Sequence, residues 1–433
     1  MTFRAFCLPR PPAVLICLAW TACALLAPSG ASADEFHYND TFMGPRAAGL
    51  AGTMIGLADD ASTAWYNPAG LGRKFSTTVT VSTTALLAKR MTVDTGYDED
   101  LEYKSMEAFS PAGITTTALG NGNIAFMALQ PMQDNSQLDQ AFSGQGVVEG
   151  RITSEESNTS YLVGISYGAR VGRGLSLGIG AGYLYQVQSA HNSIYFSYEN
   201  AQAADGSNAI ELDTSEHMVQ HGIMLLAGLL WWPLGEEGPL SLGLTLRTGV
   251  NVSSSSSTKR TLWLGFDAPN GEGQNFLRME ADAENSRGAS RTPPMLGLGV
   301  SWKVFPFWTL AADLTLHGYV RYESFGSEVI KLATLNGSLA SEFYLGDGIT
   351  LRLGAFTNRS SAKLSADNLL NCWDEYGGTA GATFTRGNYD FTFAVRISWL
   401  EGKVVLSPSD GVEDTYSATG RNVGFVFGGN YRF

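Results

Sequence analysis

Apolar and polar residues alternate at every second position in many short stretches of this sequence. In residues 389–401 one face carries large apolar side chains, namely Tyr389, Phe391, Phe393, Val395, Ile397 and Trp399. The positions between them are polar or small, among them Asp390 and Arg396. Because successive side chains of a strand point to opposite faces, this pattern predicts a β-strand with one apolar face and one polar face.

Read along the whole chain, the same alternation predicts fourteen strands. Their approximate ranges are 76–90, 107–119, 122–134, 156–171, 174–190, 216–232, 239–254, 293–304, 307–321, 334–345, 348–357, 376–385, 389–401 and 421–433. Beyond residue 34 no stretch reaches the ~20 apolar residues that a membrane-spanning helix needs. The fold is therefore expected to be all-β.

The connections between the predicted strands alternate between short and long. Tight turns are predicted at 121, 172–173, 233–238, 305–306, 346–347 and 386–388. Longer loops are predicted near 91–106, 135–155, 191–215, 255–292, 322–333, 358–375 and 402–420. Short turns at one end and long loops at the other are typical of antiparallel barrels in bacterial outer membranes.

The last predicted strand, Arg421 to Phe433, ends on an aromatic residue that is also the C-terminus. In a soluble sheet such a strand would be an exposed apolar edge. A transmembrane antiparallel β-barrel removes the edge, because its last strand pairs with its first. Phe433 therefore favours a closed barrel in which the strand at 421–433 meets the strand at 76–90.

Charged residues within the predicted strands indicate which face points into the barrel. Arginine on the lipid face costs about 2–4 kcal/mol at the bilayer midplane. We therefore expect five ionisable residues to face the lumen, where they contact either a ligand or a luminal plug: Arg247, Asp313, His317, Arg352 and Arg396. Such charges either bind a carboxylate head group or hold a plug by ion pairs, and the second use is the commoner one for buried charge.

Residues 1–33 have the features of a secretory signal peptide. Arg4 and Arg10 precede an apolar core, and a small-x-small cleavage site follows. Removing these two arginines from the 28 basic residues leaves 26 against 41 acidic ones, a net charge of about −15. Nucleic acid is not an expected partner, because its phosphates carry the same sign of charge. The mature chain keeps one cysteine, Cys372, so no internal disulfide is expected.

No catalytic site, metal site or cofactor is predicted. His217 and His221 have a spacing that suits a metal on a helix, but here they open a predicted strand with no third ligand nearby. An acidic group near 94–102 has enough oxygens for calcium but lacks a regular loop spacing, and a solvated loop is the simpler reading. Barrel enzymes need Ser, His and an acid converging on one rim, and nothing in the sequence pairs such residues.

Residues 34–75 precede the first strand and do not follow its alternation. The stretch from Phe42 to Gly72 is rich in Gly and Ala, and Asp59 or Asp60 is placed to cap a short helical turn over 61–65. Small residues allow tight backbone packing, which suits a plug inside the lumen. A periplasmic leader that only delivers the chain to the first strand is the alternative, and the residues alone leave both open.

Three runs in this stretch carry a family resemblance: 44–49 (GPRAAG), 58–62 (ADDAS) and 67–71 (NPAGL). They resemble the N-terminal signature of FadL-type outer-membrane transporters of long-chain fatty acids and other hydrophobic compounds. A second similarity runs from Met295 to Tyr322. The resemblance implies a fourteen-stranded barrel with an N-terminal luminal hatch, whose motif corresponds to Asn67, Pro68 and Ala69. It also implies passive diffusion of an apolar ligand, hatch rearrangement and lateral exit through a kinked strand, which the sequence does not place.

The sequence analysis thus predicts a signal peptide at 1–33, a hatch at 34–75 and an outer-membrane β-barrel at 76–433. The expected function is passive diffusion of fatty acids or other hydrophobic small molecules, and the expected partners are that ligand and the outer-membrane lipids. Two alternatives stay open. The barrel could serve as an anchoring accessory of a secretion machine, or as a structural or general porin. No protein partner is identified.

Overall fold

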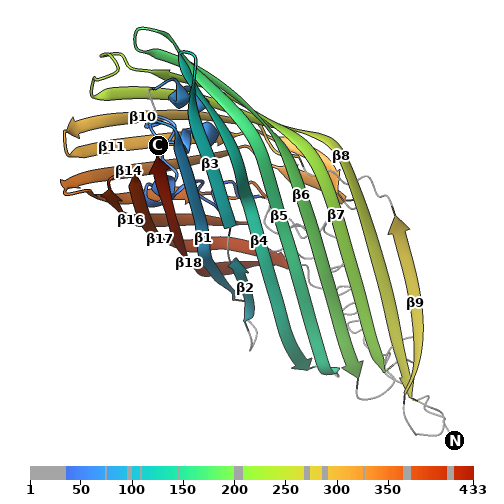
Figure 1. Ribbon diagram of the computed structural model, residues 1–433. Helices are drawn as coiled ribbons and strands as arrows, with labels where there is room; N and C mark the ends of the chain where they lie inside the picture. Colours follow the sequence, from blue (N-terminus) through green and yellow to red (C-terminus); the bar gives the residue numbers. More distant parts are fainter. Residues whose placement is uncertain are drawn as a thin grey trace, which may run out of the picture.

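The computed structural model describes residues 36–73, 76–94, 100–107, 110–144, 147–198, 208–267, 274–284, 291–324, 327–363, 372–406 and 414–433. Most of these residues belong to one large antiparallel sheet (Figure 1). The predicted signal peptide lies outside the described residues. The division into 1–33, 34–75 and 76–433 therefore stays a prediction.

The strands follow one another along the chain with short turns between many of them. They are β1 (Thr78–Val93), β2 (Leu101–Glu107), β3 (Ser110–Leu119), β4 (Gly122–Gly144), β5 (Val147–Gly172), β6 (Leu175–Tyr198), β7 (Ala209–Trp231), β8 (Leu240–Asp267), β9 (Gln274–Glu284), β10 (Met295–Phe305), β11 (Trp308–His317), β12 (Val320–Ser324), β13 (Ser327–Lys331), β14 (Thr334–Gly346), β15 (Ile349–Asn358), β16 (Trp373–Arg386), β17 (Tyr389–Leu406) and β18 (Asp414–Arg432). All of them except β12 and β13, which form a separate hairpin, belong to the large sheet.

The sheet closes into a barrel because its two ends meet. The last strand, β18, pairs with β1 from Arg432 opposite Thr78 to Ala418 opposite Val93. β2 and β3 share one place beside β1, and β9 extends only the outer end of β8. The wall itself is a closed 14-strand antiparallel barrel, with β8 paired to β10. The predicted architecture and the predicted pairing of first and last strands are confirmed.

The wall is much taller on one side. β4 to β8 contain 23, 26, 24, 23 and 28 residues, whereas β10, β11 and β15 contain 11, 10 and 10. The long strands project beyond the rest of the barrel at the end opposite to the C-terminus (Figure 1). Much of the sequence predicted as long loops at 135–155, 191–215 and 255–292 is therefore strand, and this part of the prediction was wrong. Parts of these stretches, such as the serines at 255–257, carry polar residues at every position, so the alternation on which the prediction relied is missing there.

The two faces of the barrel differ in polarity. Large apolar side chains cover the outside; Phe391 and Ile179 are each 68% exposed, and Leu339 is 63% exposed. The charged residues Arg352 and Arg396 are buried inside. A closed barrel leaves no backbone hydrogen-bonding group unpaired in lipid, so this polarity identifies a membrane-spanning wall.

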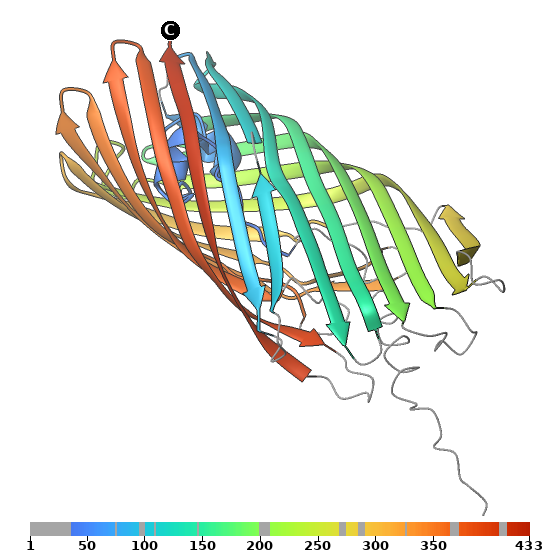
Figure 2. The ribbon, with the colours of Figure 1, turned by 90° about the horizontal axis from the view of Figure 1, so that it is seen from below.

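The residues from Phe36 to Arg73, here called the N-terminal segment, contain α2 (Pro45–Gly49), α3 (Thr63–Tyr66) and the 3-10 helix η1 (Pro68–Gly72). Figure 2 shows these short helices enclosed by the strands. No helix among the described residues is long and apolar enough to cross a membrane. The expected helical turn is present as α3, but its N-cap residue is Ser62 and no side chain caps it, so the predicted cap by Asp59 or Asp60 was wrong. The carboxylate of Asp60 instead accepts a hydrogen bond from the backbone N–H of Ser62 at 2.8 Å.

Candidate functional site: the N-terminal segment and the cavity beside it

The base of the N-terminal segment docks on inward-facing glycines of β5, β6 and β7. A Cβ at Gly168 would lie 2.2 Å from the carbonyl oxygen of Pro68, and a Cβ at Gly178 would lie 2.2 Å from the carbonyl carbon of the same residue. At Gly228 it would lie 2.1 Å from Oδ1 of Asn67. Only glycine allows backbone to approach this closely, so the wall is shaped to receive this part of the segment.

Asn67 is fully buried and connects two parts of the segment to the wall. Its Nδ2 donates hydrogen bonds to the carbonyl oxygens of Ile55, at 2.9 Å, and of Leu229 in β7, at 3.2 Å. Its Oδ1 accepts from the backbone N–H of Ala69 at 3.2 Å, which caps η1. The Ser176 hydroxyl of β6 donates to the carbonyl oxygen of Ala69 at 2.6 Å. The side-chain amide of Asn67 thus satisfies three backbone groups, two in the segment and one in the wall.

An ion-pair cluster holds the middle of the segment. Arg46 donates from Nε and Nη2 to the Glu342 carboxylate of β14 at 2.9 and 2.6 Å, and from Nη1 to Asp59 at 2.5 Å. The Nε of Arg352 in β15 donates to the same Glu342 at 2.7 Å. Burial alone would lower the pKa of the Arg46 guanidinium, but the carboxylates of Asp59 and Glu342 outweigh burial and raise this pKa well above its usual value. Arg46 is therefore a permanent cation in this cluster.

A second buried pair holds the first described residues of the segment. Arg396 of β17 donates to both oxygens of the Glu375 carboxylate in β16, at 2.7 and 2.8 Å. The same guanidinium donates to the backbone carbonyl oxygens of Asn39, at 3.1 Å, and of Asp40. Asn358 of β15 donates to Glu375 at 3.1 Å and to the Asp40 carboxylate at 2.8 Å. Arg396 therefore binds the segment through carbonyl oxygens, while its acidic partner lies in the wall.

Asp313 of β11 is another wall residue that binds the segment. Its carboxylate accepts hydrogen bonds from the backbone N–H groups of Ile55, at 2.7 Å, and Gly56, at 3.3 Å. Of the five residues expected to face the lumen, Asp313, Arg352 and Arg396 are thus placed where they hold the N-terminal segment.

The other two, Arg247 and His317, line a cavity of about 60 Å³ between the segment and the wall. The guanidinium of Arg247 lies over the ring of Trp65 at 3.7 Å, and its Nη2 donates to the carbonyl oxygen of that residue at 2.9 Å. The imidazole of His317 stacks on Tyr38 with ring centroids 4.1 Å apart. Asp313 also lines this cavity, so the structure brings three of the five predicted residues together there.

The cavity reaches an irregular place in the wall at Pro131 of β4. β4 pairs with β3 as far as Leu129 and with β2 from Ser136 onward, and its register with β5 shifts between Leu129 and Met132. Between these two stretches the residue-by-residue pairing of β4 with β2 and β3 is interrupted, although the Ser110 hydroxyl of β3 donates to the carbonyl oxygen of Gln130 at 3.2 Å and the Ser105 hydroxyl of β2 donates to the Asp134 carboxylate at 3.0 Å. Proline cannot donate to a ladder, which fits a break at this position.

An apolar cluster lies beside this break inside the barrel. Buried side chains of β3 to β7 pack there against Trp65 and Leu71 of the N-terminal segment. The wall residues in the cluster are Ala112, Ile114, Ala125, Met127, Leu129, Leu162, Leu184, Met224 and Leu226. This cluster makes part of the lumen next to the break apolar. The buried pair of Lys89 and Asp134, 4.0 Å apart, lies at the break itself, and the opposite wall carries the pairs of Arg46, Arg352 and Arg396.

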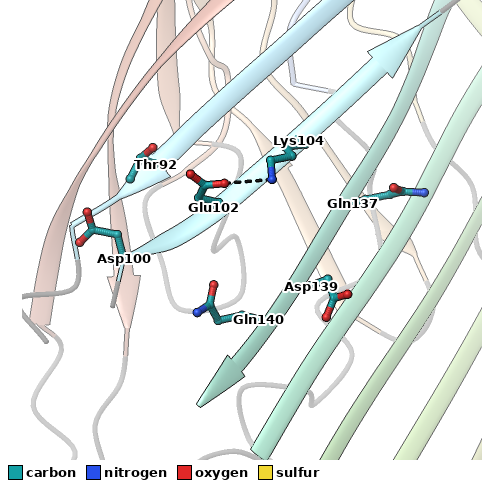
Figure 3. A pocket seen from close by; sticks show the side chains of 7 residues that line it. All are labelled: Thr92, Asp100, Glu102, Lys104, Gln137, Asp139 and Gln140. Carbon is teal, nitrogen blue, oxygen red and sulfur yellow. Dashed lines mark ion pairs between the residues drawn. The ribbon is translucent and has the colours of Figure 1, made fainter. Parts of the chain in front are cut away.

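A separate, open hollow lies at the outer ends of β1, β2 and β4 (Figure 3). Its lining is polar and includes Glu102, Lys104 and Asp139. Glu102 is paired with Lys104 at 2.9 Å and with Arg90, and Asp139 is paired with Arg151 at 2.7 Å. These pairs are solvated, and we assign no ligand to the hollow.

The histidine and acidic motifs noted in the sequence do not assemble a site. His217 and His221 lie on the outward side of β7, where their Nδ1 atoms are within hydrogen-bonding distance of the hydroxyls of Ser189, at 3.0 Å, and Tyr183, at 2.5 Å. Residues 95–99 of the acidic stretch lie outside the described residues. In the part of the chain that the structure describes, no group of three or more His, Cys, Asp or Glu side chains is arranged to hold a metal ion.

Two acidic residues at the centre of the contacts, Glu342 and Glu375, were not singled out from the sequence. Glu342 occupies an inward position of the strand predicted at 334–345, so the alternation of apolar and polar residues was sufficient to place it in the lumen. Glu375 lies one residue before the predicted strand at 376–385 and was assigned to a loop. The sequence indicates Arg46 only as part of a motif, and Asp59 as part of the same motif and as one of two candidate caps of a helical turn.

No protein-family model matches this sequence, and no curated protein matches it at a significant level. Solved structures do match the fold. A FadL homologue of Pseudomonas aeruginosa is 15% identical over 92% of this chain and 100% of that chain, with a TM-score of 0.60. The toluene transporter TodX of P. putida is 14% identical, with coverage of 92% and 99% and a TM-score of 0.55. The toluene transporter TbuX of Ralstonia pickettii is 14% identical, with coverage of 90% and 98% and a TM-score of 0.57.

The chain therefore has the fold of the FadL-type outer-membrane channels over most of its length. This confirms the architecture that the N-terminal resemblance implied. At these identities the likeness concerns the fold, so ligand and mechanism have to be argued from the residues of this chain.

Proposed function

We propose that this protein is a passive channel for hydrophobic small molecules in the bacterial outer membrane, closed by its N-terminal segment. The observation that carries the proposal is the cavity between the segment and the wall, which reaches the break at Pro131. A ligand leaving the cavity there meets an apolar lumen and then the lipid outside the barrel. No energy source is needed, because an apolar solute partitions into lipid spontaneously.

The fold neighbours support the same class of ligand. Two of them are named toluene transporters and one is a homologue of FadL. Among the alternatives, a general porin needs a water-filled lumen. Here the N-terminal segment packs against the wall from the Phe36 end to the η1 end. No contact of the described residues favours an anchoring role.

The exit we propose is the interval at 130–135 of β4, where the ladder to β2 and β3 is interrupted. The Gln130 side chain is buried, and its backbone carbonyl oxygen accepts from the Ser110 hydroxyl at 3.2 Å. The Ser105 hydroxyl donates to the Asp134 carboxylate at 3.0 Å, and Nζ of Lys89 in β1 lies 4.0 Å from the same carboxylate. In the part of the chain that the structure describes, side-chain contacts and not a continuous backbone ladder thus close this interval toward β2 and β3. A solute therefore needs less rearrangement to leave here than through the fully paired seam between β18 and β1.

The test is uptake by cells with and without the protein. Labelled toluene and a labelled long-chain fatty acid report apolar transport, and a small hydrophilic dye reports a general pore. We expect faster uptake of an apolar compound and unchanged uptake of the dye. Transport is refuted if the apolar compounds enter at the same rate in both strains, and a rise in dye uptake would identify a porin instead.

A further inference from the structure

The outer surface of the barrel carries an apolar groove of about 460 Å³, here called the wall groove. It lies where β16, β17, β18 and β1 follow one another in the wall (Figure 1). Thr83, Gly428 and Gly429 leave room at its floor. Its rim consists of large apolar side chains that are between 38% and 68% exposed, namely Val81, Phe384, Phe391, Phe393 and Phe427. The wall groove therefore opens toward the lipid and is separate from the cavity beside the N-terminal segment.

The wall groove exists because Gly429 interrupts a row of outward aromatic side chains on β18. Phe427 precedes Gly429 and Tyr431 follows it, each two residues away and thus on the same face. Phe391 of β17 is opposite Gly429 on one side, and Val81 of β1 is opposite it on the other. Large side chains thus surround a position that has none, and the backbone of β18 is open to the lipid there.

The wall groove lies next to the periplasmic rim of the barrel. Arg386 precedes the short turn between β16 and β17 and is opposite Tyr389, which in turn is opposite Tyr431. The rings of the two tyrosines have centroids 4.8 Å apart. Because a strand rises about 3.3 Å per residue, this row lies about 7 Å along the strand from Phe391. Aromatic rings near the short turns mark the level at which acyl chains give way to head groups.

One end of this row carries a cation that has no acidic partner in the described part of the chain. Arg386 is exposed and takes part in no ion pair there. Asp347 of the adjacent turn and the C-terminal carboxylate of Phe433 lie on the same rim, but neither is within ion-pair distance of Arg386. Arg432, by contrast, is paired with Asp390 at 2.9 Å. A basic side chain at the level of the head groups attracts anionic lipid.

We propose that the wall groove holds an acyl chain of an anionic phospholipid from the periplasmic leaflet, with the lipid phosphate against Arg386. Phosphate suits a guanidinium because its oxygens accept two parallel hydrogen bonds. From the phosphate the acyl chain passes Phe391 and enters the wall groove. The polar and apolar parts of the site thus follow the same order as those of the lipid. The site lies on the outside of the wall, so this inference does not depend on the proposed channel.

The test compares two lipids with the same acyl chains, dioleoylphosphatidylglycerol and dioleoylphosphatidylcholine, by native mass spectrometry of the full mature protein. Titration with each lipid gives its affinity for the first site that fills. We expect the wild type to bind the phosphatidylglycerol at least about 5-fold more tightly, because one basic residue near an anionic head group contributes roughly this factor. Arg386→Gln is expected to abolish this preference and to change phosphatidylcholine binding by less than about 2-fold.

Two further variants separate the wall groove from a general attraction of lipid to the rim. Thr83 is opposite Phe427 on the outward face, and Thr83→Phe fills the floor of the groove. This variant is expected to weaken both lipids by about 10-fold, because the acyl chain loses buried methylene groups. Arg173→Gln removes an exposed cation from the short turn between β5 and β6 and is expected to change neither lipid. The heat-dependent gel shift of intact barrels checks that each variant folds.

Equal affinity of the wild type for both lipids overturns the site, and so does an Arg173→Gln variant that loses the preference as Arg386→Gln does. Unchanged binding of both lipids to Thr83→Phe would show that the wall groove is empty. A wild-type dimer that disappears in Thr83→Phe would assign the groove to a second copy of this chain and likewise overturn the lipid site.

A phosphatidylglycerol with a photoreactive diazirine on its acyl chain locates the lipid directly in vesicles. We expect it to label peptides that contain Phe391 or Phe427, and to label them at least about 5-fold less in Thr83→Phe. Labelling spread evenly around the barrel would refute a lipid held in the wall groove.

Discussion

Nδ2 of Asn67, in the N-terminal segment, donates a hydrogen bond to the backbone carbonyl oxygen of Leu229 in β7 at 3.2 Å. The same amide group binds the carbonyl oxygen of Ile55 at 2.9 Å. One side chain therefore links two turns of the segment to the barrel wall. The remaining contacts of Asn67, through Oδ1 to Ala69, place η1 directly beside it.

Replacing Asn67 by alanine is expected to loosen the segment while the barrel still assembles. The change leaves the buried carbonyl oxygens of Ile55 and Leu229 without this donor, which costs about 1–3 kcal/mol. The open form of the segment should become roughly 5- to 150-fold more populated. Trypsin cleavage after Arg46 measures the population of the open form, because the side chain of Arg46 is only 12% exposed in the docked segment.

The control for this experiment is Asn121→Ala, whose side chain caps an exposed turn and does not touch the segment. It should leave cleavage at Arg46 at the wild-type rate. If Asn67→Ala also cleaves at that rate, the amide does not hold the segment. If the variant fails to show the gel shift of an intact barrel, Asn67 serves folding and not closure.

A methyl group at Gly178 is expected to displace the base of the segment. The added Cβ would lie 2.2 Å from the carbonyl carbon of Pro68 and 2.3 Å from the backbone nitrogen of Ala69. Overpacking of this kind costs typically about 1–3 kcal/mol. Gly178→Ala should therefore increase tryptic cleavage at Arg46. Gly172→Ala is the matched control, since a Cβ there meets nothing within 4 Å, and equal cleavage of the two variants would refute the docking role of Gly178.

The strands of the barrel wall could mostly be predicted from the sequence, whereas the contacts inside the barrel could be predicted only in part. Alternation identified the strand around Phe391 and the inward direction of Arg396, because lipid on one side and a polar lumen on the other impose the contrast. The same signal disappears where β8 continues beyond the membrane through Ser253–Ser257, which pair with His217–His221 of β7. There both faces are polar, and propensity alone does not separate a serine-rich strand from a loop.

The contacts of the N-terminal segment were less accessible to sequence reasoning. Asn67 was found through a family resemblance and not through its chemistry. Glu375 pairs with Arg396, which is 21 residues away in the sequence, across neighbouring strands. Which of several inward acids meets which arginine depends on register, and alternation specifies the face of a residue without specifying its partner.

The Glu375–Arg396 pair is expected to be strongly coupled. Both side chains are almost fully buried, at 0% and 5% exposure, so removing one partner leaves an uncompensated charge. Glu375→Gln and Arg396→Met should each lower the free energy of unfolding by about 3–5 kcal/mol, and the double variant should lose much less than the sum. Urea unfolding in lipid vesicles measures the free energy of unfolding of the wild type, both single variants and the double variant, which together form a double-mutant cycle. The exposed pair of Asp139 and Arg151 is the control and should couple by no more than about 1 kcal/mol.

Additive losses in that cycle would show that the two residues act separately. Arg396 also donates to the carbonyl oxygens of Asn39 and Asp40, so its loss should release the start of the segment as well. Cleavage by trypsin at Arg46 separates the two effects. Arg396→Met is expected to increase cleavage more than Glu375→Gln does.

A disulfide between the segment and the wall is expected to stop transport. The Thr53 hydroxyl of the segment donates to the Ser338 hydroxyl of β14 at 2.9 Å, so cysteines at these two positions lie within bonding reach. In a Cys372→Ser background, Thr53→Cys with Ser338→Cys should oxidise and fix the segment at the cavity. Uptake of the labelled apolar compound should fall to the level of cells without the protein and return on reduction.

Thr77→Cys with Thr117→Cys is the matched control, because these hydroxyls are 3.1 Å apart within the wall and a bond there leaves the segment free. Unchanged uptake through the oxidised Thr53–Ser338 variant would mean that a ligand passes without movement of the segment at this point, and closure by the segment would have to be abandoned.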